Sequence, residues 1–229
     1  MEPLIIGAVV LAFIAFAVWG AYAAAQRKKE LTAWAQANGL SFSTGRDGSF
    51  DDRYGAFDAL RRGSNRYAHN IMRGRRDDRP VCAFDYHYET YSRDKKGRRQ
   101  THHHHFSAVI VDCPLPLKPL RIRPEGFFDK VTEFFGMDDI DFELDAFSRA
   151  FHVTSPDKPW AFDVIHQATM EFLLSAPRFT IHMEGGAVMV YRGGTMKADT
   201  FGSALDVACG ILDRLPRYLL NEMKSEGGT

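Results

Sequence analysis

The chain has 229 residues, of which 45% are hydrophobic and 13% aromatic, and its 29 basic residues balance its 29 acidic ones. This composition excludes a disordered chain and is typical of a folded domain with a substantial core. The three cysteines, Cys82, Cys113 and Cys209, contain no CxxC pair. They therefore indicate neither a zinc ribbon nor a disulfide framework, and they fit a reducing cytoplasm.

The first segment is an uncharged apolar run of 22 residues, from Leu4 to Ala25. As a helix rising ~1.5 Å per residue it would extend about 33 Å, enough to cross a hydrocarbon core of ~30 Å. We therefore predict that residues 1–25 form a transmembrane anchor. A cleaved secretory signal and a buried helix of a soluble protein are the alternatives. The run lacks a positive leading region and is longer than a signal's apolar stretch, and it lacks the polar face usual in a soluble helix.

Arg27, Lys28 and Lys29 follow the run directly, and no basic residue precedes it. Because positive charge near a span prefers the cytoplasm, the expected topology is a single pass through the cell membrane with the C-terminal domain in the cytoplasm. Residues 26–38 should continue as a juxtamembrane helix that Asn38 and Gly39 end.

The charges are unevenly distributed along the rest of the chain. Residues 26–125 hold 20 Lys and Arg against 12 Asp and Glu, a net +8, whereas residues 126–229 hold 9 against 16, a net −7. A basic half beside the membrane would be attracted to the anionic inner leaflet, so we expect anionic lipid contact. Two solvated faces of opposite sign explain the pattern as well.

Alternating and helical hydrophobic patterns predict the elements of an α+β domain over residues 39–223, followed by a frayed tail at 224–229. Strands are expected at residues 40–44, 66–72, 80–91, 102–112, 120–123, 140–143, 151–154, 179–183 and 187–191. Helices are expected at residues 127–135, 144–150, 158–174 and from about 199 to 215. Residues 54–60 suit either a strand or a helix. Asp157 is the expected cap of the third helix, and Asp199 or Thr200 of the last.

The strand at residues 80–91 carries two different faces. Phe84, Tyr86 and Tyr88 share one face, which suits a core, while Asp85, His87 and Glu89 share the other. The loop at residues 92–100, which joins this strand to the next, is rich in Lys and Arg. It could touch phosphates, but a solvated hairpin tip is the simpler interpretation, and nucleic-acid binding is not expected.

Four consecutive histidines, His102 to His105, open the next strand. Alternate residues share a face, so either His102 with His104 or His103 with His105 can converge on one site. The paired strand supplies further ligand types in His87, Glu89 and Asp85, and imidazoles with a carboxylate suit zinc or a similar transition metal. The candidate metal ligands are His87, Glu89, His102 and His104. A solvent-facing strand end explains the run without a metal.

The chain contains no GxSxG, Walker A, GxGxxG or HExxH motif, so no familiar catalytic machinery is indicated.

Segments of the acidic half, together with residues 106–111, resemble a family of uncharacterised bacterial proteins that carry one N-terminal membrane span. The similarity lies in Glu143–Phe147, Ser148–Val153, Phe162–His166, Met170–Leu174 and the hairpin at 179–191, and extends over most of residues 80–215. It implies a bacterial, membrane-tethered domain and brings no activity or catalytic residues.

Together these patterns predict an antiparallel sheet with several packed helices behind a single N-terminal transmembrane helix. The expected function is a membrane-anchored, noncatalytic binding or scaffold domain without a cofactor. The alternative is a metal-dependent enzyme or sensor that uses the histidine-rich hairpin.

Overall fold

The computed structural model describes residues 2–126 and 140–226, and within them the domain is α+β as predicted. The helices are α1 (Glu2–Ala37), α2 (Phe50–Arg53), the 3-10 turn η1 (Asp58–Arg61), α3 (Asp145–Ser148), α4 (Lys158–Val164), α5 (Gln167–Ser175), α6 (Ala198–Asp213) and α7 (Arg217–Glu226). The strands are β1 (Ser41–Ser43), β2 (Ser64–Arg76), β3 (Arg79–Arg93), β4 (Arg99–Asp112), β5 (Leu120–Pro124), β6 (Phe151–Thr154), β7 (Thr180–Glu184) and β8 (Ala187–Gly193).

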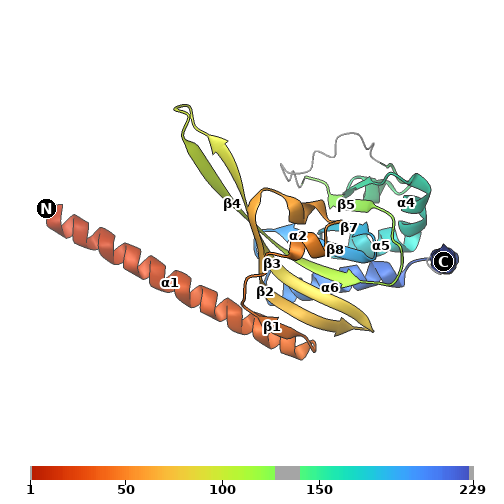
Figure 1. The fold of residues 1–229 in the computed structure, drawn as a ribbon, viewed down its shortest axis with the longest axis horizontal. Helices are drawn as coiled ribbons and strands as arrows, with labels where there is room; N and C mark the ends of the chain where they lie inside the picture. The colour runs from red at the N-terminus through yellow and green to blue at the C-terminus, as the bar shows by residue number, and fades with distance from the viewer. Residues whose placement is uncertain (1, 127–139, 227–229) are drawn as a thin grey trace.

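The described strands form one sheet in the order β1-β2-β3-β4-β8-β7-β5-β6, and every neighbouring pair is antiparallel. The long hairpin of β3 and β4 extends well beyond the body of the domain (Figure 1). The sheet has a core on each face, because alternate residues of the central strands point to opposite sides. Val109 packs with α6 on one face, and Ile110 packs with Phe84 and the α2–η1 segment on the other.

Helix α1 is continuous from the apolar run into the domain. The apolar side chains at Ile6 and from Val10 to Tyr22 are exposed, whereas Leu31 and Ala35 are fully buried against the sheet. Trp34 packs on Phe201 of α6, with ring centroids 6.0 Å apart. Figure 1 shows the N-terminal part of the helix projecting away from the domain. The exposure contradicts a buried soluble helix, and α1 is long and apolar enough to span a membrane.

Several sequence predictions hold, and three need correction. Asp157 caps α4 by accepting a hydrogen bond from the Trp160 amide at 3.0 Å, as expected. The predicted helix at 158–174 is broken after Val164, where His166 turns to bond the Arg214 carbonyl at 2.8 Å. Residues 140–143 form no strand. The last long helix begins at Ala198, so neither Asp199 nor Thr200 caps it.

Three further predicted segments have different outcomes. The helix expected at residues 127–135 lies outside the described residues. Residues 54–60, for which the sequence suits either a strand or a helix, lead into the 3-10 turn η1. Pro216 separates α6 from α7, and α7 continues to Glu226, inside the segment that we expected to fray.

Candidate functional site at the base of the anchor helix

The candidate site lies on the sheet face that α1 and α6 cover. Along β3 this face begins in the core with Val81 and Ala83 and continues through Asp85, His87 and Glu89 toward the hairpin tip. The cover of helices ends at Asp85, where α1 leaves the domain. The polar half of the strand therefore starts at the point where α1 is attached.

Arg27 of α1 and Asp85 of β3 form a bidentate ion pair at this point. The Nη1 and Nη2 atoms of Arg27 donate to the two carboxylate oxygens at 2.7 and 2.9 Å, and Nη2 also donates to the Met196 carbonyl at 2.8 Å. Asp85 is 1% exposed. Charge-assisted fork geometry of this kind fixes orientation as well as distance. It attaches the helix only two residues after the apolar run ends.

Two neighbouring strands complete the surroundings of Asp85. Asn70 donates to its carboxylate at 2.9 Å, and the Ser107 hydroxyl donates to it as well. Ser107 in turn accepts the Met196 amide at 2.9 Å. Asn70 has a φ of 48° at a register shift in β2, a conformation that Asn tolerates better than most residues. One buried carboxylate thus joins α1, β2, β3, β4 and the segment before α6.

The sequence offers no motif for this junction. Asp85 is predicted only as a further ligand type beside the histidines and Arg27 only as a topology signal, and the roles of Asn70 and Ser107 are not predicted. Two features of the sequence could have indicated the junction. Asp85 is an acid between the aromatic residues of a strand, and Arg27 is the first cation after the apolar run.

The register of the hairpin decides where the four histidines point. His105 pairs with His87 and His103 with Glu89, while His104 pairs with Tyr88 and His102 with Thr90. His102 and His104 therefore lie on the opposite face from His87 and Glu89, and the predicted set of four ligands is not brought together. On that other face His104 stacks on Tyr88 at 4.7 Å, and its Nε2 lies 2.7 Å from the Thr90 hydroxyl.

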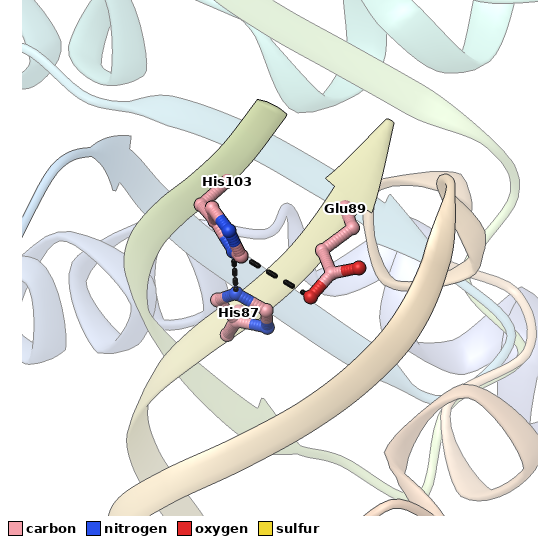
Figure 2. Close-up of side chains that lie close together, drawn as sticks. All are labelled: His87, Glu89 and His103. Atoms are coloured by element: carbon pink, nitrogen blue, oxygen red, sulfur yellow. Dashed lines mark hydrogen bonds and ion pairs between the residues drawn. The ribbon is translucent and has the colours of Figure 1, made fainter. Parts of the chain in front are cut away.

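His103, and not the predicted pair His102 and His104, lies beside His87 and Glu89. Its Nδ1 lies 3.2 Å from His87 Nε2 and 3.5 Å from Glu89 Oε1. Figure 2 shows the three side chains, two from β3 and one from β4, meeting on one side of the hairpin. One nitrogen or oxygen atom from each lies within 4.8 Å of those of the other two.

The buried member of the trio is held by its neighbours. His87 is 4% exposed, stacks on Tyr67 at 4.7 Å, and places Nδ1 at 3.1 Å from the Asn65 carbonyl oxygen. A carbonyl oxygen only accepts, so Nδ1 carries the proton and Nε2 presents its lone pair to His103. The ring is thus fixed in both orientation and tautomer.

The carboxylate of Glu89 is also oriented. Asn65 Nδ2 donates to Oε1 at 2.6 Å, and the Tyr91 hydroxyl donates to Oε2 at 3.0 Å. The hydrogen bond from Asn65, with help from Tyr91, His103 and His87, lowers the pKa of Glu89. The group is therefore an anion at neutral pH.

Two further histidines flank the trio on the side nearer Asp85. His105 packs on His87 with ring centroids 4.9 Å apart, and His69 lies on β2, paired with Asp85. Burial lowers the pKa of both His69 and His105, so their rings are neutral at pH 7. This face consequently carries two neutral imidazoles, those of His69 and His105, beside the base of α1.

The tip of the hairpin is basic and exposed. The turn that joins β3 to β4, with the strand residues directly beside it, carries five cations: Arg93, Lys95, Lys96, Arg98 and Arg99. Asp94 organises the turn by accepting the Lys96 and Arg98 amides, each at 2.9 Å, and pairs with the Arg98 side chain at 2.8 Å. One acid against five cations leaves the tip with a clear positive charge.

A separate cavity of about 160 Å³ lies at the other end of the sheet, lined by Pro119, Arg121, His182 and Glu184 among others. Asp58 forms an ion pair with Arg121 there, and His182 Nε2 lies 3.1 Å from Glu184. These charges are partnered among themselves, so the cavity has the character of a structural network.

No family model and no curated protein matches the chain. Among solved structures, the mycobacterial trehalose monomycolate transport factor A, TtfA, is similar with a TM-score of 0.61 and 14% sequence identity. The match covers 83% of this chain and 96% of that one. At this identity the similarity establishes a shared fold, and it agrees with the α+β domain expected from the sequence.

Proposed function

We propose that the chain is a single-pass membrane protein whose domain is a noncatalytic binding or scaffold module on the cytoplasmic face. The observation that carries the proposal is the construction of α1. Its first part exposes apolar side chains such as Phe13 and Phe16, and its last part is fixed to the sheet by Arg27 and Leu31 without a linker. A helix built in this way holds a domain at a set orientation to a bilayer.

The charges support the cytoplasmic orientation and a contact with anionic lipid. Lys28 and Lys29 are exposed directly after the apolar run, on the side that the positive-inside rule assigns to the cytoplasm. The hairpin and the N-terminal part of α1 extend on the same side of the domain (Figure 1). This arrangement supports a contact between the basic tip of the hairpin and the leaflet, where each cation near the surface would contribute about 1 kcal/mol of attraction.

A noncatalytic role is supported by what surrounds the buried carboxylate of Asp85. Asp85 is fully engaged by Arg27, Asn70 and Ser107, which is an arrangement for holding elements together. The similar solved structure is described as a transport factor, and a module that holds a partner or cargo at a membrane is consistent with that description.

Membrane fractionation tests the anchor. The full chain should stay in the membrane after washing at alkaline pH, and a chain without residues 1–25 should be released while keeping its far-ultraviolet circular dichroism. A retained truncated chain, or an extracted full chain, would contradict the proposal. A hydrolytic or transfer activity measured in the purified protein would contradict the noncatalytic role.

Protease treatment tests the topology. In intact cells the domain should resist added protease, and it should be digested once the membrane is opened with detergent. Digestion of the domain from outside would reverse the proposed orientation.

A further inference from the structure

We propose that His87, Glu89 and His103 bind one transition-metal ion, Zn²⁺ or one of similar preference, at the base of the hairpin. These residues differ from the four ligands predicted from the sequence. The register between β3 and β4 places His103 on the face of His87 and Glu89, and it places His102 and His104 on the opposite face. The site stands independently of the proposed membrane role, since it depends on β2, β3 and β4 alone.

The distances fit a tetrahedral ion. With metal–nitrogen bonds of about 2.0–2.1 Å, two ligands of a tetrahedral site lie about 3.4 Å apart. His103 Nδ1 lies 3.2 Å from His87 Nε2 and 3.5 Å from Glu89 Oε1, on either side of that value. One ligand atom from each of the three residues lies within 4.8 Å of the other two, so side-chain rotations would have to bring them onto one centre, with water as the fourth ligand.

The supporting contacts are those that metal-binding histidines use. His87 donates Nδ1–H to the Asn65 carbonyl, which leaves the Nε2 lone pair directed at the site. Asn65 also donates to Glu89 through its side chain, so a single residue of β2 orients two ligands. Its φ of 49° lies at a register shift in β2, where the strand brings backbone and side chain to the same place. Such outer contacts fix tautomer and direction before the ion arrives.

The ligand chemistry selects the class of ion. Two imidazoles and one carboxylate favour zinc and neighbouring transition metals over Ca²⁺ and Mg²⁺, which prefer oxygen ligands. Three protein ligands leave an open position, and His103 is on the solvent side, which gives the ion a path of entry. A hydrogen-bonded chain from His87 through His103 to Glu89 is the alternative, and metal titration distinguishes the two.

The experiment uses the untagged full chain in detergent, stripped of metal with a chelator and titrated with Zn²⁺ against a chromophoric competitor. The matched pair of variants is His103→Ala and His102→Ala, which are adjacent, exposed histidines on opposite faces of β4. We expect one ion per wild-type chain and unchanged affinity in His102→Ala. In His103→Ala the affinity should fall by at least about 100-fold, because losing an outer-shell partner alone costs 10- to 100-fold.

Cobalt provides a second readout that is independent of affinity. Co²⁺ in the wild-type site should give visible absorption bands typical of four-coordination, and Glu89→Gln should weaken or shift them. Absence of binding at one equivalent, equal losses in His102→Ala and His103→Ala, or octahedral cobalt spectra in the wild type would each overturn the proposal. Circular dichroism of each variant identifies any that fails to fold. If Glu89→Gln fails to fold, the difference in zinc affinity between His103→Ala and His102→Ala decides the proposal.

Discussion

Arg27 places two guanidinium nitrogens against the carboxylate of Asp85, at 2.7 and 2.9 Å, where the apolar helix enters the domain. Buried pairs of this kind stabilise little relative to an apolar pair, but losing one partner is costly because the other charge stays buried. The main role of the Arg27–Asp85 pair is therefore to fix the position of α1 on the domain. The pair makes the direction in which α1 leaves the domain a property of the fold.

Replacing Arg27 should destabilise the protein sharply. Arg27→Met leaves the Asp85 carboxylate buried without its cation, and we expect a loss of about 2–4 kcal/mol in the free energy of unfolding, reduced from the fully buried case because Arg27 is partly exposed. Denaturant unfolding in mild detergent measures it. The matched control is Lys28→Met, one residue along on the exposed side, which should stay within about 0.5 kcal/mol of the wild type. Equal effects of the two variants would remove the structural role given to Arg27.

Asp58 should make stability depend on pH. Burial alone would raise the pKa of Asp58, but Arg121, with His182 and Arg62, lowers it below its ordinary value. A lowered carboxyl pKa adds stability above the unfolded value of about 3.9, and that stability is lost as the pH falls through the folded value. Asp58→Asn should therefore cost about 1–3 kcal/mol at pH 7, less than a fully buried pair because Asp58 is partly exposed. Urea unfolding of both proteins at pH 7 and below pH 4 should show the difference shrinking, and a constant difference would argue against the ion pair.

The cysteines should be unreactive in the folded protein. Burial raises the pKa of the Cys82 thiol to about 11, and burial also raises the pKa of Cys113 and Cys209. Because the thiolate is the reactive form, labelling by a disulfide reagent at pH 8 should be slow in buffer and complete for all three thiols in urea. A rapid phase of one equivalent in buffer would show that one thiol is accessible.

Two glycines of α6 should respond oppositely to alanine. A Cβ at Gly210 would collide with the ring of Phe172, whereas a Cβ at Gly202 would meet Trp34 Nε1 at 3.4 Å. Alanine gains about 1 kcal/mol of helix propensity at either site, but overpacking at Gly210 costs typically 1–3 kcal/mol or more. Gly210→Ala should therefore lower the melting temperature, and Gly202→Ala should leave it unchanged or raise it. The same change at both sites would contradict the close contact between Phe172 of α5 and Gly210 of α6.

The sequence predicted what depends on local pattern and failed where distant segments meet. Alternation along β3 placed Phe84, Tyr86 and Tyr88 on the core face and His87 and Glu89 on the other, as the structure confirms. Which alternate pair of histidines faces His87 depends on the register, which the turn between Arg93 and Arg99 sets. A shift of one residue exchanges the faces, and periodicity alone cannot exclude that shift.

The junction at Asp85 was out of reach for a different reason. Arg27 and Asp85 lie 58 positions apart, and neither belongs to a motif that requires the other. Their pairing depends on where α1 crosses the sheet, which buried residues such as Leu31 and Ala35 determine together with α6. The helix break at His166 is similar, because a contact with the Arg214 carbonyl of another element decides it.

Fluorescence quenching shows whether α1, fixed to the domain by Arg27, holds the basic hairpin at the lipid surface as we propose. A fluorophore on Gln100→Cys, at the exposed hairpin end, is compared with one on Ser225→Cys in α7, in bilayers whose headgroups carry a nitroxide quencher. In bilayers with anionic lipid the hairpin label should be strongly quenched and the α7 label only weakly, and high salt should reduce the difference. Equal quenching at the two positions, or none at Gln100→Cys, would contradict the account.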